Sequence, residues 1–322
     1  MYNIGIDLGG TNIAAGIVAP SGEIIKKCSA KTDKTSEETV ISGMADIVKM
    51  LLSESGISRD EIGTLGVACP GIVDGERGVV ERSANLPLLG TNVAEMLAGK
   101  TGIDISRIRT ANDADAAALG EYHAGSGRGV HDFLMVTIGT GIGGGYISGG
   151  RILTGRNHAG GEFGHTVIVC GGEPCGCGRR GCAEKYCSAT ALVRLTRETL
   201  DECERDGTQT MMTDMVRRDG KISGRTPFRA ADAGDETAMR VVDRYISYLA
   251  CTLTNFINVF QPEVLAVGGG LSNEGERLLL PLRERVYAEM YNKYQPRRLY
   301  TEIKRAELGG DAGIIGAARL GG

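Results

Sequence analysis

The stretch "YNIGIDLGGTNIAAGIVAPSGEIIKKCSA", residues 2–30, predicts the first sheet of the protein. Three runs rich in apolar residues are separated by Gly-Gly-Thr at 9–11 and by Pro-Ser-Gly at 20–22. Short apolar runs bounded by such turn residues are typical of neighbouring antiparallel strands. We therefore expect a meander of strand, glycine turn, strand, turn and strand.

The same order returns in "HDFLMVTIGTGIGGGYISGGRIL", residues 131–153, where Gly139-Thr140-Gly141 joins two apolar runs. Glycines allow backbone N–H groups to approach an anion closely, and a threonine hydroxyl adds a further donor. One copy is weak evidence, because hairpins commonly need glycine. Two copies, at 7–11 and 137–145 in the two halves of one chain, indicate phosphate binding.

Two other nucleotide motifs do not fit. Gly139-x-Gly141-x-x-Gly144 matches a dinucleotide fingerprint, but that fingerprint opens a helix and here a strand follows. The chain also lacks a G-x-x-x-x-G-K-[ST] loop.

The remaining patterns alternate between helix and strand and predict an α/β protein. The predicted elements are a helix over 40–56, a strand over 62–71, a strand over 108–113 that runs into a helix over 114–123, a helix over 236–260, a strand over 263–267 followed by glycines, a helix over 273–291 and a last helix within 308–320.

Composition narrows the class of protein. The 322 residues are 42% hydrophobic and 24% charged, with a net charge of -4, which is ordinary for a soluble globular protein and favours neither nucleic acid nor an anionic membrane as a partner. No apolar run approaches the roughly 20 residues of a membrane span. The N-terminus shows no secretory signal. We therefore expect a cytoplasmic protein, in which nine cysteines are poor candidates for structural disulfides.

The stretch "HAGGEFGHTVIVCGGEPCGCGRRGCAEKYCS", residues 158–188, predicts a metal site. Cys175, Cys177 and Cys182 lie close together in a glycine-rich segment, and His165 is the nearest candidate for a fourth ligand. Zinc prefers four such ligands in a tetrahedron, and redox work is the weaker alternative because no C-x-x-C is present. The other cysteines are interpreted as small buried apolar residues: Cys28, Cys69, Cys170, Cys187, Cys203 and Cys251. His158 is expected to be an isolated, exposed loop residue that binds no ligand.

Seven motifs, in this order along nearly the whole chain, resemble the ROK-type sugar kinases of the actin-like ATPase superfamily, and most of all the bacterial glucokinases of that family. They are "DLGGTN" at 7–12, "NLP" at 85–87, "NDADAAALGE" at 112–121, "TIGTGIGGG" at 137–145, "GEFGH" at 161–165, "CGCGRRGCAE" at 175–184 and "VGGGLS" at 267–272. None is specific alone. Repressors of the family carry a helix-turn-helix segment before the first strand, and this sequence starts at the strand, so an enzyme is expected.

The resemblance implies two lobes of ribonuclease-H-like fold, with ATP and sugar in the cleft between them. We expect a smaller lobe over 1–113, with a helix over 311–322 packed back on it, and a larger lobe over 114–310 that holds the zinc loop and the adenosine site. The implied reaction is phosphorylation of glucose by ATP with Mg²⁺, in a homodimer or homotetramer. N-acetylmannosamine, N-acetylglucosamine and fructose are alternative substrates. A sugar-responsive regulator and an actin-like ATPase are alternative functions.

The same resemblance assigns roles to residues. It places Asp113 as the catalytic base. It places the phosphates at Asp7, Gly9, Gly10, Thr11, Asn12, Gly139, Thr140 and Gly141, and the adenosine at Gly268, Gly269 and Gly270. It places the sugar at Gly71, Asn85, Asn112, Asp113, Glu162, His165 and Glu184. Asp7 would hold Mg²⁺ through water, or would instead be satisfied by the neighbouring turn amides.

Four of these residues can also be interpreted from their own chemistry. Asn112-Asp113 before an alanine-rich helix is typical of an N-cap, and the positive end of a helix is expected to lower the pKa of Asp113. A weak base suffices where the proton leaves late. His165 has two ring nitrogens, so one can bind zinc while the other faces a sugar hydroxyl. Glu184 follows Cys182 by two residues, and a structural zinc would therefore position both.

Overall fold

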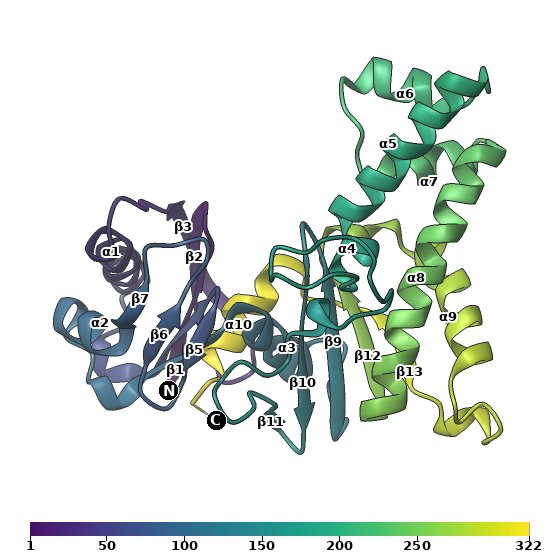
Figure 1. The fold of residues 1–322 in the computed structure, drawn as a ribbon. Helices are drawn as coiled ribbons and strands as arrows, with labels where there is room; N and C mark the ends of the chain where they lie inside the picture. Colours follow the sequence, from purple (N-terminus) through teal and green to yellow (C-terminus); the bar gives the residue numbers. More distant parts are fainter. Residues whose placement is uncertain (322) are drawn as a thin grey trace. The chain divides into compact units, whose positions relative to one another are not determined.

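The computed structural model describes residues 1–321, and its first sheet is the expected meander extended by two parallel strands (Figure 1). The strand order is β3-β2-β1-β4-β8. Strand β2 pairs antiparallel with β1 and β3, whereas β4 pairs in parallel with β1 and β8. The strands are β1 (Tyr2–Leu8), β2 (Asn12–Val18), β3 (Ile24–Lys31), β4 (Ile62–Cys69) and β8 (Ile108–Asn112).

The second sheet repeats this order as β11-β10-β9-β12-β13. The first, second and third strands in chain order again form one edge, and two later strands extend the other edge. The strands are β9 (Asp132–Ile138), β10 (Ile142–Ser148), β11 (Arg151–Ile152), β12 (Val264–Gly268) and β13 (Glu302–Arg305). The duplicated order confirms the expected pair of ribonuclease-H-like sheets.

A third, three-stranded sheet was not expected from the sequence. It has the order β5-β6-β7 and consists of β5 (Ile72–Asp74), β6 (Val79–Arg82) and β7 (Leu89–Asn92). These strands have at most four residues each, which is too short to show a clear alternation of apolar and polar residues. The sheet begins directly after Gly71, one of the predicted site residues.

Helix ends follow local chemistry. Ser36 and Thr39 form a capping box at the start of α1, and Gly56 ends it in the left-handed conformation, as predicted. The predicted helix over 236–260 is confirmed as α8. The helices are α1 (Glu37–Ser55), α2 (Val93–Thr101), α3 (Asp113–Ala124), α4 (Glu184–Cys187), α5 (Ala189–Asp206), α6 (Met211–Asp219), α7 (Arg225–Asp232), α8 (Glu236–Phe260), α9 (Glu276–Glu289) and α10 (Ala312–Ala318), with 3₁₀ turns that include η3 (Phe163–His165) and η4 (Gly270–Glu274).

The first sheet is covered on both faces. Apolar side chains of α1 and α2 form the main core with β1, β2 and β4. On the other face α10 packs against β1 and β4 and against α3. This approach depends on glycines, because a Cβ at Gly66 would lie 1.7 Å from the carbonyl oxygen of Ala317. The last helix of the chain thus completes the core of the first sheet.

Contacts divide the chain into two units. The first unit comprises residues 1–134, 144–161 and the segment from Glu307, and the second comprises residues 135–143 and 162–306. Helix α3 groups with the first unit because it packs on α10, whereas the sequence places a lobe boundary between 113 and 114. The lobe boundary stays a prediction.

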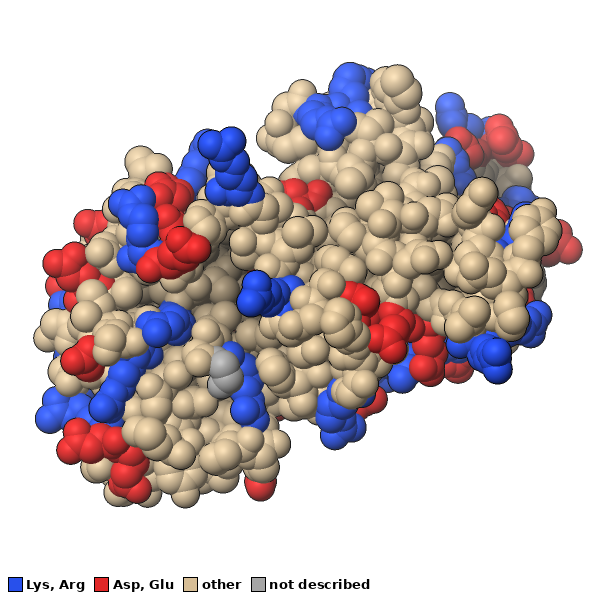
Figure 2. All heavy atoms as spheres, turned by 90° about the horizontal axis from the view of Figure 1, so that it is seen from below, with Lys and Arg blue, Asp and Glu red and all other residues tan. Residues whose placement is uncertain are grey.

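Charges of both signs are mixed on one face of the molecule (Figure 2). On the face shown in Figure 2, Lys and Arg side chains alternate with Asp and Glu, and the described residues there form no large field of one sign. Within residues 1–321, no helix has both the length and the apolar character needed to cross a membrane.

Candidate functional site

Asp113 is the first residue of α3, and Asn112 is its N-cap. The Asn112 Oδ1 atom accepts hydrogen bonds from the N–H groups of Ala114 at 2.8 Å and Asp115 at 3.3 Å. Asn112, and not Asp113, is therefore the main cap of this helix. The Asp113 Oδ1 atom accepts from Ala114 N–H at 2.9 Å, which fixes one oxygen of the carboxylate.

The expected direction of the Asp113 pKa is wrong. Burial raises this pKa above its ordinary value and outweighs the lowering effect of the Ala114 N–H. The pKa of Asp7 is raised to about 6, first by burial and then by the negative charge of Asp113, against the lowering effect of Lys27. Both carboxylates are half-buried, and a carboxylate that is partly removed from water can take up a proton or lie beside a cation. Asp7 could therefore hold Mg²⁺.

Gly71 adopts a backbone conformation that only glycine fits. Its φ is 118°, and a Cβ would lie 2.1 Å from the carbonyl oxygen of Arg82. The Gly71 carbonyl accepts a hydrogen bond from Asn112 Nδ2 at 2.9 Å. The structure thus brings Gly71, Asn112 and Asp113 together at the ends of β4 and β8.

The first glycine turn joins β1 to β2 beside this group. Gly9 N–H donates to the carbonyl of Asn12 at 2.9 Å, and Thr32 Oγ1 donates to the carbonyl of Gly9 at 2.7 Å. A Cβ at Gly10 would contact the Asn85 side chain at 3.5 Å. Asn85 therefore adjoins the turn that contains Gly9, Gly10, Thr11 and Asn12.

His165 uses its two ring nitrogens in two directions, within the second unit. Its Nδ1 atom lies 3.6 Å from Cys175 Sγ, and its Nε2 atom lies 4.0 Å from Glu162 Oε2. The Glu162 side chain is 56% exposed. One face of the imidazole thus meets the cysteine cluster, and the other meets a carboxylate that can accept hydrogen bonds from sugar hydroxyls.

The predicted metal ligands gather in one cluster. One ligand atom from each of His165, Cys175, Cys177 and Cys182 lies within 4.8 Å of the others. The N–H of Arg179 and then the neighbouring thiols lower the pKa of Cys177, which favours the thiolate that a metal binds. Three sulfur atoms and one nitrogen form a donor set that zinc prefers, so these four residues could hold Zn²⁺. Cys170, in contrast, is exposed, and its interpretation as a buried apolar residue is wrong.

Glu184 connects this cluster to the second glycine turn. Its Oε1 atom accepts from Cys175 Sγ at 4.0 Å, and its Oε2 atom accepts from the N–H of Ile142 at 3.3 Å. A Cβ at Gly141 would lie 2.3 Å from Glu184 Oε2. The turn is held further by Ala189 N–H, which donates to the carbonyl of Gly139, and by Thr190 Oγ1, which donates to the carbonyl of Thr140.

The predicted adenosine segment lies beside the same turn. Gly268 ends β12, Gly269 has a φ of 79°, and Gly270 begins η4. A Cβ at Gly269 would lie 2.5 Å from the carbonyl oxygen of Ile138, the last residue of β9. The two glycine segments of the second unit therefore adjoin, as a nucleotide site that spans both would need.

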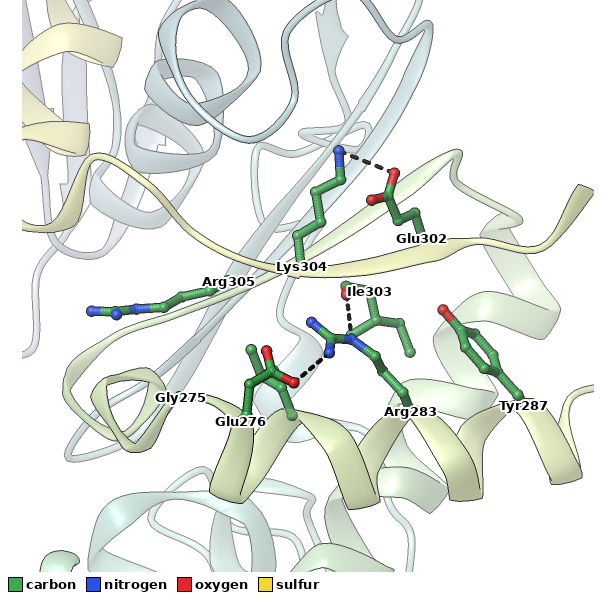
Figure 3. A pocket seen from close by; sticks show the side chains of 9 residues that line it. Gly275, Glu276, Arg283, Tyr287, Glu302, Ile303, Lys304 and Arg305 are labelled. Atoms are coloured by element: carbon green, nitrogen blue, oxygen red, sulfur yellow. Dashed lines mark hydrogen bonds and ion pairs between the residues drawn. The ribbon is translucent and has the colours of Figure 1, made fainter. Parts of the chain in front are cut away.

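A separate hollow lies between α9 and β13 and contains none of the predicted site residues (Figure 3). Its volume is about 600 Å³. Figure 3 shows Arg283 reaching from α9 toward β13, where it donates to the carbonyl of Ile303 at 2.9 Å. Arg283 also pairs at 2.7 Å with Glu276, which lies on α9 itself. Lys304 pairs with Glu302 at 3.0 Å. Its basic groups are thus already paired with groups of the protein.

One contact near the site was missed from the sequence. His158 is not an isolated exposed residue: its side chain is 23% exposed, and its Nε2 atom lies 3.4 Å from Asp74 Oδ1. The two residues are far apart in the chain and belong to no common motif. The left-handed φ of 57° at His158 gives no sequence signal either, because such conformations are typical of glycine.

The comparisons with known proteins all find members of one family. The model of the ROK family matches residues 3–321. The glucokinase of Thermotoga maritima is 36% identical over 320 residues, which cover 98% of this chain and 96% of that protein. The glucokinase of Halalkalibacterium halodurans is 34% identical over 321 residues, which cover 99% and 94%.

The structure resembles a solved member of the same family. A ROK family glucokinase from Streptomyces griseus, in complex with glucose and AMPPNP, superposes with a TM-score of 0.79. The two sequences are 31% identical, and the match covers 99% of each chain.

Proposed function

The chain belongs to the ROK family and is a sugar kinase, and we propose that it transfers the γ-phosphoryl group of ATP to the 6-hydroxyl of glucose. The glucokinases among its relatives support glucose as the acceptor, and the AMPPNP bound to the Streptomyces griseus enzyme supports ATP as the donor. Glucose 6-phosphate and ADP are the products.

The half-buried carboxylate of Asp113 is the observation that carries this proposal. It lies at the start of α3, one of its oxygens accepts from Ala114 N–H, and burial raises its pKa. A raised pKa makes the carboxylate a better proton acceptor than an exposed aspartate. The oxygen of the 6-hydroxyl attacks the γ-phosphorus, and the bond between the γ-phosphorus and the oxygen of the leaving ADP breaks. Asp113 takes the proton of the 6-hydroxyl in this step.

We assign the sugar hydroxyls to Asn85, Asn112, the backbone of Gly71, Glu162, His165 and Glu184. The two ring nitrogens of His165 support this role, because Nε2 stays free of the cysteine cluster. Carboxylates such as Glu162 can accept two hydroxyls at once.

The glycine turns are assigned to the phosphates and adenosine. Residues 9–12 and 139–141 are assigned to the phosphates, and Gly268, Gly269 and Gly270 are assigned to the adenosine. Asp7 would hold Mg²⁺ through water, which supplies charge neutralisation at the phosphates. The raised pKa of Asp7, about 6, supports a neighbouring cation.

Zinc is proposed as a structural ion in this protein. His165, Cys175, Cys177 and Cys182 would hold it with four protein ligands, which leaves no open position for catalysis. Its effect would be to fix the His165 ring and the segment that leads from Cys182 to Glu184.

The proposal is tested by ADP release coupled to NADH oxidation across a panel of sugars. The panel contains glucose, fructose, N-acetylglucosamine and N-acetylmannosamine, each with ATP and Mg²⁺. We expect glucose to give the highest kcat/KM.

Two outcomes would contradict different parts of the proposed function. If no hexose accelerates ADP release above the background of ATP alone, the phosphorylation reaction is wrong. If an N-acetylated hexosamine has a far higher kcat/KM than glucose, the reaction stands and only the substrate is wrong.

A further inference from the structure

The loop from Leu153 to Gly161 leads directly into Glu162 and is closed at its base. Leu153 N–H donates to the carbonyl of Tyr146 at 2.9 Å, and Gly160 N–H donates to the carbonyl of Thr154 at 2.8 Å. A Cβ at Gly160 would lie 2.8 Å from the carbonyl carbon of Thr154. The two ends of the loop are therefore packed against each other, and its tip is formed by residues 156–158.

His158, at this tip, has a strained backbone. Its φ of 57° is left-handed, and within residues 1–321 the one other non-glycine residue with positive φ is Gln261. Gln261 is the C-cap of α8, where a left-handed residue is common. His158 caps no helix. A strained conformation persists only where surrounding contacts hold it, and such residues cluster at functional sites.

The contact that holds His158 is with Asp74. His158 Nε2 lies 3.4 Å from Asp74 Oδ1, and the Asp74 side chain is only 11% exposed. The same Oδ1 atom accepts from the N–H groups of Glu76 and Arg77, both at 3.1 Å. Asp74 is thus fixed by the turn between β5 and β6, and it offers a rigid anchor to the loop.

This anchor is close in sequence to the sugar-binding group of the first unit. Asp74 ends the short strand β5, which begins directly after Gly71. The carbonyl of Gly71 is bonded to Asn112, the cap that precedes Asp113. On the other side of the contact, Glu162 lies four residues after His158 in the chain.

Glu162 has little to hold it by itself. Its side chain is 56% exposed, and among the described residues its one ion-pair contact is with His165 Nε2 at 4.0 Å. It follows Gly160 and Gly161, the second with a φ of 81°. An exposed side chain with few contacts must be ordered when it binds a ligand, and this ordering weakens binding unless the protein orders the side chain beforehand.

We propose that the contact between His158 and Asp74 is a tether that orders Glu162 for sugar binding, so that His158 is a positioning residue. The inference rests on the proposed function, in which Glu162 binds the sugar. It assigns His158 no contact with the sugar itself. Loss of the tether should weaken the binding of glucose and leave the chemical step and the nucleotide site nearly unchanged.

The test uses His158→Gly, because glycine accepts a φ of 57° without strain and removes only the tether. We expect KM for glucose to rise about tenfold, with kcat and KM for ATP within about twofold of wild type, since only uniform substrate binding is lost. Calorimetric titration with glucose should show the same loss of affinity. The melting temperature should not fall, because a strained residue has been relieved.

Asn157→Gly is the matched control. Asn157 is exposed and lies at the same loop tip, so this variant adds equal backbone freedom and keeps the tether. It should bind glucose as wild type does. Asp74→Asn keeps an acceptor for Glu76 and Arg77 and removes the charge that faces His158. As a single substitution, Asp74→Asn should weaken glucose binding. When it is added to His158→Gly, it should have little further effect.

Three results would overturn the tether. These are wild-type glucose affinity in His158→Gly, an equal loss of affinity in Asn157→Gly, and additive effects of the Asp74 and His158 substitutions. A wild-type protein that binds no hexose would instead overturn the proposed function, and the tether with it.

Discussion

Asp113 and Asp7 are carboxylates whose pKa values are raised by burial in the first unit. Such a pair is unfavourable for folding, because neither group is fully solvated when it is ionised. In the proposed reaction the pair is useful, because Asp113 would accept a proton and Asp7 would face a cation. At the scale of the residue, the surroundings that raise these two pKa values therefore lower the stability of the folded protein but favour the proposed reaction.

Asp113→Asn should lower kcat by roughly 10²-fold or more, because removal of the hydroxyl proton is a transition-state interaction. The amide oxygen of asparagine can still accept from Ala114 N–H, so glucose should bind with near-normal affinity. Steady-state kinetics and calorimetric titration check this expectation. Asp201→Asn on the exposed surface of α5 is the control. A variant with near-normal kcat would leave Asp113 a structural role only.

Asp7→Asn should stabilise the protein at neutral pH. The folded-state pKa of Asp7 is about 6, against 3.8 for the ordinary group, so the folded state binds more protons than the unfolded state between these values. Stability from this group is therefore present below about pH 4 and is lost as the pH rises through about 6.

Thermal unfolding at several pH values, in EDTA to exclude divalent cations, measures this effect. The melting temperature of Asp7→Asn should exceed that of wild type at pH 7.5, and the difference should shrink toward pH 4. A constant difference across this range would show that the Asp7 carboxylate is not the cause. Activity should be lost in the same variant.

At the scale of the element, the segment from η3 to α4 joins two kinds of contact. His165 meets Cys175 on one side and Glu162 on the other, and Glu184 meets Cys175 and the N–H of Ile142. A change in the cysteine cluster should therefore alter the residues proposed to bind the sugar before it alters the cores of the sheets.

Cys177→Ser should remove the metal and weaken glucose binding steeply in a protein that remains folded. Structural zinc stabilises the segment that it closes, and both units have apolar cores of their own. Affinity for an ATP analogue should change little. Metal analysis of the purified protein and two calorimetric titrations measure these effects.

Cys170→Ser is the control, because Cys170 is exposed and lies outside the cluster. It should keep both the metal and the glucose affinity. Wild-type protein without stoichiometric zinc would remove the metal site. A zinc-free Cys177→Ser protein that binds glucose normally would separate the metal from the sugar site.

At the scale of the whole molecule, the chain returns to its first sheet through its last helix. Helix α10 lies against β1, β4 and α3, and glycines on both sides permit the approach. Glu121, at the end of α3, is fully buried and accepts from the N–H groups of Ser126, Glu307 and Leu308. This carboxylate holds the returning segment where it rejoins the first unit.

Gly316→Ala should destabilise the protein by about 1–3 kcal/mol or more, as overpacking of a core does. The added Cβ would lie 1.6 Å from the carbonyl oxygen of Ala116, so α10 must move away from α3. Urea unfolding measures the change. Gly99→Ala in α2 is the matched control, because nothing lies within 4 Å of its Cβ position. There the substitution should stabilise by up to about 1 kcal/mol through helix propensity.

The sequence by itself determined the features that depend on neighbours in the chain. The glycine turns at 9–11 and 139–141 predicted both meanders, and the apolar periodicity of 236–260 predicted α8 with its bounds, because turn chemistry and helical spacing act over a few residues. The spacing of Cys175, Cys177 and Cys182 likewise pointed to His165, and the structure brings these four residues together.

Only the tertiary structure decided what depends on burial and on distant contacts. The helix end at Asp113 predicted a lowered pKa, but packing around the carboxylate removes water, and burial raises the pKa instead. The contact of His158 with Asp74 and the bond of Asn112 to Gly71 join residues that the chain alone does not relate. The charged segment of β13 and the short strands β5, β6 and β7 carry no strand periodicity, and they become strands because neighbouring strands supply their hydrogen bonds.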